Sequence, residues 1–505
     1  MSDLALAWFR RDLRLTDNPA WAAATSGRTA VPVVVLEPQL CAAAGPHRLR
    51  AYLGALAGLD RALQRLGASL RATVGDPAQE LPRMAAELGT TTVCVNTDVT
   101  PYSKRRDRLA AAALGCPLEV YWGTVVQPPG SVLTRSGALS RVFTPFWRRW
   151  QATPLPPRAD ADNKMLCSVK VAMTLSDALA ELARRGVKLP TPQPDSHRTG
   201  GESDSRTEMW SADCAEAQLE RWLTAVDRYD ESRDLFGAGS ASQPRLFSTH
   251  APAGRPCDLC SIGGTSQLSV ALRFGLLSPR AVVAAVGTGT PGRAAFVRQL
   301  AWRDWYAHLT WEHPHIATRA LKPPYDRVAW RTGDQAARDF DAWCAGRTGY
   351  PIVDAAMRQL AATGWIHNRL RMVAASFLVK DLLVDWRRGE RWFRRLLTDG
   401  ELAQNAGNWQ WVAGTGPDAA PYFRVFNPVA QSRRFDPDGT HLRQWLPELA
   451  RLPTEAIHAP WEVSPELLAA AGVTLGSDYP APIVDHGEAR LQTLAAYQAT
   501  LAESG

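Results

Sequence analysis

Two kinds of segment alternate along the first third of the chain. Runs rich in apolar and β-branched residues stand at residues 4–9, 31–37, 69–74, 91–96 and 118–122. Such runs are typical of buried strands. Between them lie amphipathic stretches, such as residues 47–67 and 77–89, with the spacing of helices. The alternation predicts an α/β domain at residues 1–130, with a doubly wound parallel sheet.

The pattern changes after residue 130. Residues 131–210 are rich in Pro, Ser and Asp, with one helical patch at 175–186, which predicts a long interdomain linker. From residue 211 to residue 497 nearly every segment has the period of a helix. We therefore expect a second, larger all-α domain at residues 211–497.

Composition predicts the cellular compartment and the kind of partner. No apolar run is long enough to span a membrane, and the N-terminus is charged early, which predicts a cytoplasmic protein. The eight cysteines are scattered, and Cys257 and Cys260 have no second ligand pair, so we interpret them as free thiols and expect no metal. A net charge of +7 favours a polyanionic partner. Nineteen Trp against thirteen Phe and ten Tyr is unusual, and directs attention to tryptophan.

The glycine motif "GTGTPG" at residues 287–292 matches a dinucleotide-binding pattern in form only. A true site of that kind follows a strand and opens a helix. Here Ser278 and Pro279 supply an N-cap and a first-turn proline, so the segment before the glycines is predicted to be a helix. The glycines then form a turn between two helices, and a nicotinamide site is not expected.

A mixed set of side chains stands out in the helical part. Trp365, Asn368 and Met372 have the spacing i, i+3 and i+7, which places them on one face of a single helix, with Arg369 and Arg371 beside them. An indole, an amide, a thioether and two guanidiniums are poor core material. The pattern therefore favours the lining of a binding site.

Three stretches carry a resemblance to a known family. Residues 348–427, "FRRDLRLTDNP" near the N-terminus and "AWRDWY" at 301–306 resemble the DNA photolyase/cryptochrome family, and most closely the class I cyclobutane pyrimidine dimer photolyases. The resemblance implies an antenna domain joined to a helical FAD domain. It implies light-driven repair of pyrimidine dimers, a deoxyribodipyrimidine photo-lyase reaction, with an electron supplied by reduced FAD. A cryptochrome-like blue-light receptor without repair is the alternative, and a (6-4) photolyase is disfavoured because Asn368, not a second His, follows His367.

The resemblance also assigns cofactor and electron-transfer residues. Asn405 matches the position next to flavin N5, where an amide can accept from N5–H. Trp409, Trp386 and Trp330 match a chain that carries electrons from the surface. The set that matches FAD-binding positions is Tyr229, Thr265, Ser266, Gln267, Leu268, Ser269, Arg303, Trp365, Asn368, Arg371, Asp399, Glu401 and Asn405.

The same comparison assigns the substrate side. Trp411 and Trp302 would form two walls around flipped-out bases. The full set is Trp302, Trp411, Asn368, Met372, Arg369, Arg233 and Gln299. Gln299 and Gln267 depart from the family, which usually has Glu and Arg there, and Glu401 replaces a common Asp. UV-damaged DNA is the expected partner, bound through phosphates without sequence preference by a monomer. The Arg-aromatic stretches 141–150 and 385–397 are either DNA contacts or solvated helix faces.

Two further features follow from the resemblance. Asp98, Thr100 and Tyr102 are similar to an antenna site for 8-hydroxy-5-deazaflavin, although Thr100 stands where Glu is common; methenyltetrahydrofolate, or no antenna, is the alternative. Residues 236–262, with the Cys257 and Cys260 pair, form an insertion relative to the family.

Overall fold

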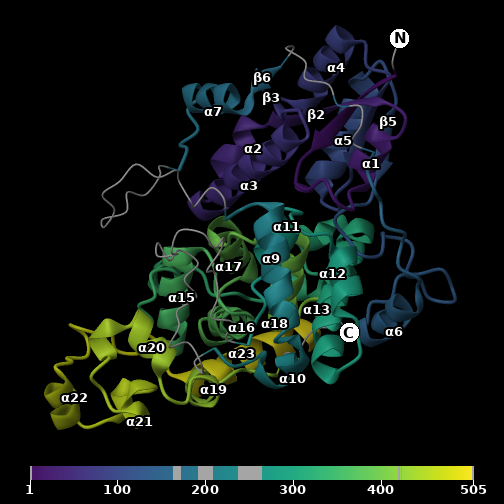
Figure 1. Cartoon of the computed structure of the whole chain (residues 1–505). Coiled ribbons are helices and arrows are strands. Elements are labelled where there is room, and N and C mark those ends of the chain that lie inside the picture. The colour runs from purple at the N-terminus through teal and green to yellow at the C-terminus, as the bar shows by residue number, and fades with distance from the viewer. Residues whose placement is uncertain are drawn as a thin grey trace, which may run out of the picture. The chain divides into compact units, whose positions relative to one another are not determined.

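The computed structural model describes residues 3–162, 166, 172–190, 209–236, 264–418, 421 and 423–502. These residues form two compact units (Figure 1). The first contains residues up to Asp227 and residues 266–314; the second contains residues 228–236, 264–265 and 315–502. The units divide the chain at other points than the predicted domains, whose bounds stay a prediction. Nearly all of the predicted insertion, including Cys257 and Cys260, lies outside the described residues.

The first unit is built on a six-stranded sheet in the order β5-β4-β1-β2-β3-β6. The strands are β1 (Leu4–Phe9), β2 (Thr29–Leu36), β3 (Arg71–Val74), β4 (Thr92–Asn96), β5 (Leu118–Tyr121) and β6 (Met173–Thr174). The pairings among β1 to β5 are all parallel, with Leu6 opposite Val31 and Val93. All five predicted strands are confirmed. The short edge strand β6 was not predicted; it pairs antiparallel with β3, and both of its residues are exposed, which leaves no hydrophobic pattern to detect.

Helices connect the strands of this sheet, and further helices follow along the chain (Figure 1). In the first unit they are α1 (Pro19–Thr25), α2 (Pro38–Ala43), α3 (Pro46–Arg65), α4 (Pro77–Leu88), α5 (Pro101–Ala113), α6 (Phe143–Ala152), α7 (Leu175–Arg184), α9 (Ala212–Leu223), α11 (Ser269–Arg273), α12 (Pro279–Val286) and α13 (Pro291–Glu312). Helix α7 coincides with the helical patch predicted inside residues 131–210. Ser278 caps α12 by accepting from the Ala281 N–H, and the glycine motif connects α12 to α13, which confirms the helix–helix turn.

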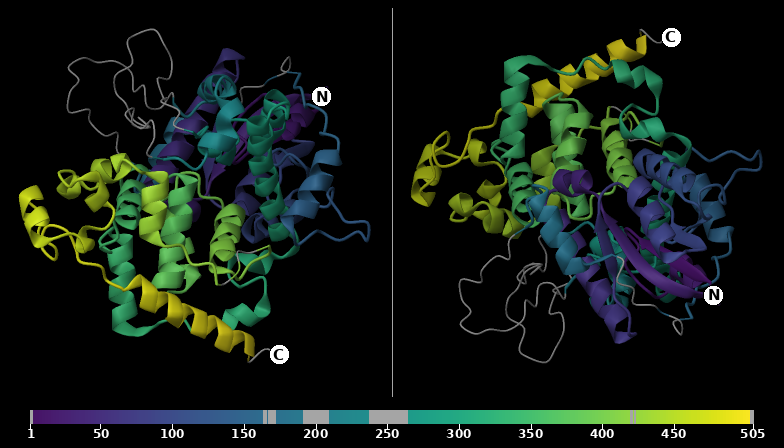
Figure 2. Two further views of the ribbon diagram at one scale, coloured as in Figure 1. Left: turned by 90° about the horizontal axis from the view of Figure 1, so that it is seen from below. Right: turned by 90° about the horizontal axis from the view of Figure 1, so that it is seen from above.

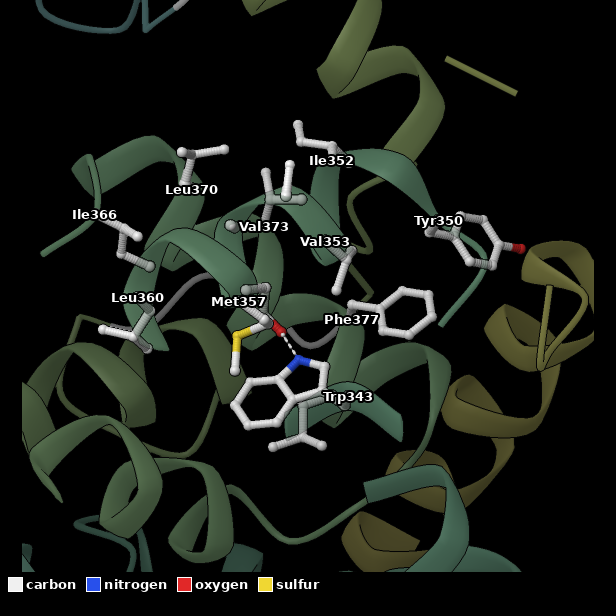
Figure 3. Close-up of a cluster of buried hydrophobic side chains, with 14 of the residues drawn as sticks. Trp343, Tyr350, Ile352, Val353, Met357, Leu360, Ile366, Leu370, Val373 and Phe377 are labelled. Carbon is white, nitrogen blue, oxygen red and sulfur yellow. Dashed lines mark hydrogen bonds between the residues drawn. The ribbon is translucent and has the colours of Figure 1, made fainter. Parts of the chain in front are cut away.

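The regular elements in the described part of the second unit are helices, apart from an isolated β-bridge between Leu475 and Tyr479. After η1 (Val226–Arg228) its elements are α10 (Tyr229–Ser232), η2 (Pro314–Ala317), η3 (Pro323–Arg327), α14 (Gly333–Cys344), α15 (Pro351–Thr363), α16 (Asn368–Ser376), η4 (Phe377–Asp381), α17 (Trp386–Leu396), α18 (Leu402–Ala413), α19 (Pro428–Phe435), α20 (Thr440–Trp445), η5 (Pro447–Leu449), α21 (Thr454–Ile457), η6 (Pro460–Glu462), α22 (Pro465–Ala471) and α23 (His486–Ala502). Helix α23, in yellow in Figure 2, packs against η3 and the π-helix η4. One continuous core joins α14 to α18, and Figure 3 shows part of it around Trp343.

The predicted single helical face for Trp365, Asn368 and Met372 is wrong for Trp365. Helix α15 ends at Thr363, and Gly364 follows in the left-handed region with φ +72°. His367 then caps the start of α16, where its Nδ1 accepts from the Arg369 N–H. Trp365 therefore lies in the connection between two helices. Asn368 and Met372 do share a face of α16, with 3.7 Å between Nδ2 and Sδ.

Two buried histidines stand near this connection. His441, at the start of α20, is 4% exposed, and its Nε2 has no hydrogen-bond partner among the described residues. The ring of Phe236 contacts both His441 and His367, with centroids 5.3 Å and 6.0 Å apart. Burial, and then the neighbouring His367, lowers the pKa of His441 to about 3; burial lowers the pKa of His367 to about 4. Both side chains are therefore neutral in the folded protein near pH 7.

We expect replacement of His441 by Leu to weaken the loss of stability at acid pH. Because the folded pKa lies below the unfolded value of about 6.5, stability from this group is present above that pH and is lost as pH falls toward 3. Between pH 7 and pH 5 the wild type should lose about 2 kcal/mol through His441 that the variant does not lose. Urea unfolding at both pH values measures this, with exposed His315→Leu as control. Equal pH dependence in the wild type and His441→Leu would contradict the assignment.

Candidate functional site

The Trp409–Trp411 pair lies near the end of helix α18. Successive positions in a helix are about 100° apart, so side chains two residues apart point to nearly opposite sides. Trp409 is accordingly 2% exposed and part of the core, whereas Trp411 is only partly buried. Gly414, with φ +81°, ends the helix after Ala413, within one turn of Trp411. The two indoles therefore lie in two different surroundings.

Asn405 lies one turn before Trp409 on the same helix, and its amide is held by Glu390 of α17. The Asn405 Nδ2 donates to the Glu390 backbone oxygen and to Glu390 Oε1, at 2.9 Å each. Glu390 is 2% exposed, and burial raises the pKa of its carboxyl, although Arg394 opposes the shift. Since both contacts use the amide N–H₂ group, Oδ1 is presented as an acceptor. This arrangement fits a cofactor that offers an N–H donor, as reduced flavin does at N5.

Trp409 packs directly against the backbone of α17. A Cβ placed on Gly389 would lie 2.2 Å from Trp409 Cη2 and 2.5 Å from Leu378 Cδ2, so a larger side chain has no room. Trp386 begins the same helix one turn earlier and is fully buried in the same core. Because Trp386 and Gly389 are three residues apart, they share a face of α17. The absence of a side chain at Gly389 thus brings the Trp409 ring close to the face that carries Trp386.

Trp330, the third member of the predicted chain, is partly buried against this core. Its ring meets that of Tyr497 in α23 edge to face, with centroids 6.1 Å apart. The indole Nε1 atoms of Trp386 and Trp330 are both buried and have no hydrogen-bond partner among the described residues. The second unit therefore contains all three predicted members, from the core to a partly exposed ring.

A bidentate ion pair lies beside the connection between α15 and α16. Arg371 Nη1 and Nη2 donate to the two carboxylate oxygens of Asp399 at 3.1 Å and 2.8 Å, and Nε donates to the Ile366 backbone oxygen at 3.0 Å. Asp399, Trp365 and Glu401 are all buried, at 6–9% exposure. Paired guanidinium and carboxylate groups in this fork are held rigidly. The arrangement holds the Arg371 guanidinium in one orientation, with its charge paired to Asp399.

Three of the predicted lesion-side residues, Asn368, Arg369 and Met372, lie in the first turns of α16. Arg369 forms an ion pair with Asp234 at 2.9 Å and lies over the ring of Phe435, 4.5 Å from its centroid. Asn368 and Arg233 are exposed, and Met372 is partly buried. Arg369 is therefore already neutralised by a carboxylate, which the sequence did not indicate.

The predicted phosphate-binding residues span both units along the chain. In the second unit, Gly264, just before Thr265, approaches Ser232 of α10 so closely that a Cβ would lie 2.5 Å from the Ser232 oxygen. Tyr229 belongs to the same short helix, and burial raises its pKa to about 12. In the first unit, Gln218 donates to the Ser266 oxygen at 2.8 Å, and Gln267 has φ +53°, a left-handed conformation. Leu268 and Ser269 then start α11.

Three further predicted residues lie on α13 in the first unit. Arg303 donates to the backbone oxygens of Thr124 and Leu272, so its guanidinium holds the fold together as well. Gln299 Nε2 donates to the Ala295 oxygen at 3.3 Å, one turn back on the helix. One face of the Trp302 ring is covered by Phe143, with centroids 3.6 Å apart and planes inclined by 11°. Phe143 was not predicted; it belongs to the Arg-aromatic stretch 141–150.

The predicted antenna residues lie where β4 ends and α5 begins. In this sheet β1 leads to β2 on one side and neighbours β4 on the other, so the strand order reverses between β1 and β4. Ligands of such sheets bind beyond the carboxyl ends at that point. Asp98 forms an ion pair with Arg11, which follows β1, at 3.1 Å. Burial would raise the pKa of Asp98, but Arg11, Arg273 and Arg10 lower it below its ordinary value.

Thr100 and Tyr102 have distinct structural contacts there. Thr100 Oγ1 caps α5 by accepting from the Ser103 N–H at 3.2 Å, and so has a structural role. The Tyr102 hydroxyl donates to Glu37, and its ring is 47% exposed. Burial raises the pKa of Glu37 to about 7 despite the Tyr102 hydrogen bond. Of the three predicted antenna residues, Tyr102 is thus the one that presents an exposed aromatic ring.

Sequence reasoning missed the two residues that orient the centre of the site, Gly389 and Glu390. Both lie in the stretch 385–397, which we had considered only as a DNA contact or a solvated face. Its buried side consists of Trp386, Gly389, Glu390 and Phe393. The signal available in the sequence was a single Glu on the apolar face of an Arg-rich helix. Glu390 lies four residues after Trp386 and four before Arg394.

The comparisons with known proteins agree over the whole chain. Residues 5–162 match the family model described as DNA photolyase, and residues 296–499 match the FAD binding domain of DNA photolyase. A deoxyribodipyrimidine photo-lyase of Agrobacterium fabrum is 36% identical over 98% of this chain and 97% of its own. The crystal structure of a class III photolyase from Agrobacterium tumefaciens has a TM-score of 0.82 and 34% identity, covering 99% of this chain and 98% of that one. A Synechocystis cryptochrome has a TM-score of 0.83 and 28% identity, covering 98% and 99%.

The likeness to both a class III photolyase and a cryptochrome means that the narrower class I assignment stays a prediction. None of the helices in the described part of the chain is long and apolar enough to cross a membrane. With two family models covering most of its residues and full-length relatives above 30% identity, this chain belongs to the DNA photolyase family.

Proposed function

We propose that this protein repairs cyclobutane pyrimidine dimers in DNA under blue light, using reduced FAD. The observation that carries the proposal is the Asn405 amide, whose N–H₂ group is held by Glu390 so that its oxygen can accept from a flavin N–H. Bound reduced FAD would supply a light-driven electron to the dimer. The full-length match to proteins named deoxyribodipyrimidine photo-lyase supports this reaction.

The chain's own residues would bind and orient the flavin. Asn405 Oδ1 would hold the proton at N5, and the Arg371–Asp399 pair would place a fixed guanidinium beside the ring system. Hydroxyl and backbone N–H groups of residues 265–269, with Tyr229, suit a diphosphate. Gln267 and Gln299 are neutral where the family usually has charged residues, so the diphosphate and the substrate each meet one charge fewer.

The DNA side of the proposal rests on stacking and on phosphate contacts. Trp411 is partly buried, and Trp302 has one face covered by Phe143, so each can offer an indole surface to a flipped base. Asn368 and Met372, in contact on α16, would meet the lesion, and the exposed Arg233 would meet a phosphate. We propose UV-damaged DNA as the partner, which the match to proteins named deoxyribodipyrimidine photo-lyase supports.

Light repair is tested with a thymine-dimer oligonucleotide and protein reduced in the absence of air. We expect loss of the dimer after blue light and none in darkness. Matched undamaged DNA, and protein stripped of FAD, are the controls. Tight FAD binding with no light-dependent loss would overturn the proposal in favour of a photoreceptor, a function that the likeness to a cryptochrome would then explain.

We also propose that Trp409, Trp386 and Trp330 carry electrons to oxidised FAD. The support is the direct packing of Trp409 on α17 at Gly389, one turn from the buried Trp386, and the partly exposed Trp330 in the same core. Indoles suit this role because they are oxidised without movement of heavy atoms.

Replacement of Trp386 by Phe should abolish lasting photoreduction of FAD and leave repair by chemically reduced enzyme unchanged. Phenylalanine fills most of the space but is far harder to oxidise than an indole. Absorbance of the bound flavin under blue light with an external reductant measures the first effect, and dimer loss measures the second. Trp461→Phe, in the same core, is the control. Loss of repair by pre-reduced enzyme would remove Trp386 from this route.

For the antenna we propose 8-hydroxy-5-deazaflavin at the carboxyl ends of β1 and β4. The support is the reversal of strand order there and the 47% exposed ring of Tyr102 beside Glu37 and Arg106. An aromatic ring with nearby acid and guanidinium groups can stack on a flat chromophore and bond to its polar edge.

We expect Tyr102→Ala to raise the Kd for 8-hydroxy-5-deazaflavin about tenfold, equivalent to about 1.4 kcal/mol of lost stacking. Titration with the chromophore, followed by its visible absorbance, measures this. Val120→Ala, an exposed residue of the edge strand β5, is the matched control. Retention of methenyltetrahydrofolate or a second FAD in place of the deazaflavin would overturn the assignment.

A further inference from the structure

Phe143, the first residue of α6, covers one face of the Trp302 ring on α13. The two ring centroids are 3.6 Å apart and the planes are inclined by 11°, so the rings overlap almost fully. Phe143 is 1% exposed, whereas Trp302 is only partly buried. The covered face of the indole is therefore closed to a ligand, and a stacking partner has to approach from the other side.

The orientation of the Trp302 side chain depends on ring packing. Among the described residues there is no acceptor for Trp302 Nε1, whereas Trp305 Nε1, one turn later, donates to the Ser140 backbone oxygen at 2.8 Å. The Trp305 ring meets that of Trp302 edge to face, with centroids 5.2 Å apart, and the Tyr306 ring is tilted by 35° at 5.8 Å. Of these three neighbouring rings, only that of Phe143 lies parallel to the indole.

Helix α6, which begins with Phe143, is itself fixed to α13. Trp150 Nε1 donates to Asp304 Oδ2 at 2.8 Å, and Asp304 is fully buried. The Phe146 ring meets that of His308 edge to face, with centroids 5.2 Å apart. A buried hydrogen bond and a ring contact therefore hold α6 in place beyond its first residue. Phe143 is consequently a rigid support for the indole.

A ring that is already held in its bound orientation stacks on a base at a smaller entropic cost. A tryptophan that is free to turn loses the rotation about its side-chain dihedrals when it stacks on a ligand, and this loss reduces the affinity. Here Phe143 restricts the Trp302 ring before any ligand is bound. The face of the indole that remains open is therefore presented in one orientation.

We propose that Phe143 is a positioning residue for lesion recognition, which holds the Trp302 indole so that one face is presented to the flipped bases of a pyrimidine dimer. The inference rests on the proposed repair function, in which Trp302 stacks on those bases. Because Phe143 is buried, it acts on the DNA only through Trp302. It contributes to the affinity for damaged DNA, and not to the electron transfer that splits the dimer.

The experiment measures binding in darkness of full-length FAD-loaded protein to a thymine-dimer oligonucleotide and to its undamaged counterpart. Phe143→Leu replaces the flat ring by a side chain that cannot lie flat on an indole. We expect its Kd for the dimer DNA to rise about fivefold, because Trp302 regains rotational freedom, while its Kd for undamaged DNA stays unchanged. Repair per absorbed photon, by reduced protein saturated with dimer DNA, should also stay unchanged. Phe9→Leu is the matched control, because Phe9 is a buried ring of the same unit that packs on Trp21.

A double-mutant cycle tests whether Phe143 acts through Trp302. In a Trp302→Ala background, Phe143→Leu should change the Kd for dimer DNA by less than about twofold, because no indole remains to be held. An equal change in both backgrounds would show a general effect on the fold and would overturn the inference. If Phe143→Leu does not fold or bind FAD, the cycle is run with Phe143→Met, which adapts to an irregular space but has no flat ring.

The outcomes separate this inference from the function on which it rests. An unchanged Kd for dimer DNA in Phe143→Leu, or equal weakening for damaged and undamaged DNA, overturns the inference and leaves the proposed repair standing. An unchanged Kd in Trp302→Ala removes Trp302 from the lesion side, and the inference with it. Equal binding of both oligonucleotides by the wild type overturns the proposed function itself.

Discussion

The contact between the Trp409 ring and the backbone of α17 at Gly389 is the constraint on which the second unit is organised. A single methyl group at Gly389 would lie 2.2 Å from the ring, so this approach is possible only for glycine. It fixes the distance between α17 and α18. That distance in turn sets Asn405, one turn away, within reach of Glu390 on α17. One packing contact thus positions both a buried indole and a polar acceptor.

Helices α17 and α18 pack through apolar side chains and also bury a carboxyl and an amide group, two requirements that usually conflict. Glu390 is buried at 2% exposure, and an isolated carboxyl there would be costly. It is tolerated because the Asn405 amide donates to it, and because Arg394 lies 3.1 Å away, one turn along α17. The fold therefore maintains a buried acid in order to hold one amide in one orientation. An apolar residue at position 390 would be simpler for packing but would leave the Asn405 amide with one bond fewer, to the backbone oxygen of residue 390 alone.

The sequence predicts those elements that depend on residues close together along the chain, and misses those that depend on distant residues. The five parallel strands were predictable because each is a continuous apolar run, and the α12–α13 turn because Ser278 is a local cap. Strand β6 has two exposed residues and owes its conformation to β3. Trp365 lies outside the predicted helix because Gly364 ends α15. Gly364 was a local signal in the sequence, but the helical spacing of Trp365, Asn368 and Met372 pointed to a single helix. Glu390 and Phe143 were missed because their contacts, with Asn405 and Trp302, are with residues far along the chain.

The tryptophan excess now has a physical interpretation that composition alone could not supply. Indoles in this core differ less in burial than in what their nitrogens meet: Trp343 donates to Ala374, and Trp386 donates to no described group. A hydrogen bond that is worth little to the stability of a neutral ring is worth more to a charged one. The arrangement of acceptors can therefore order the indoles by ease of oxidation while the packing remains uniform.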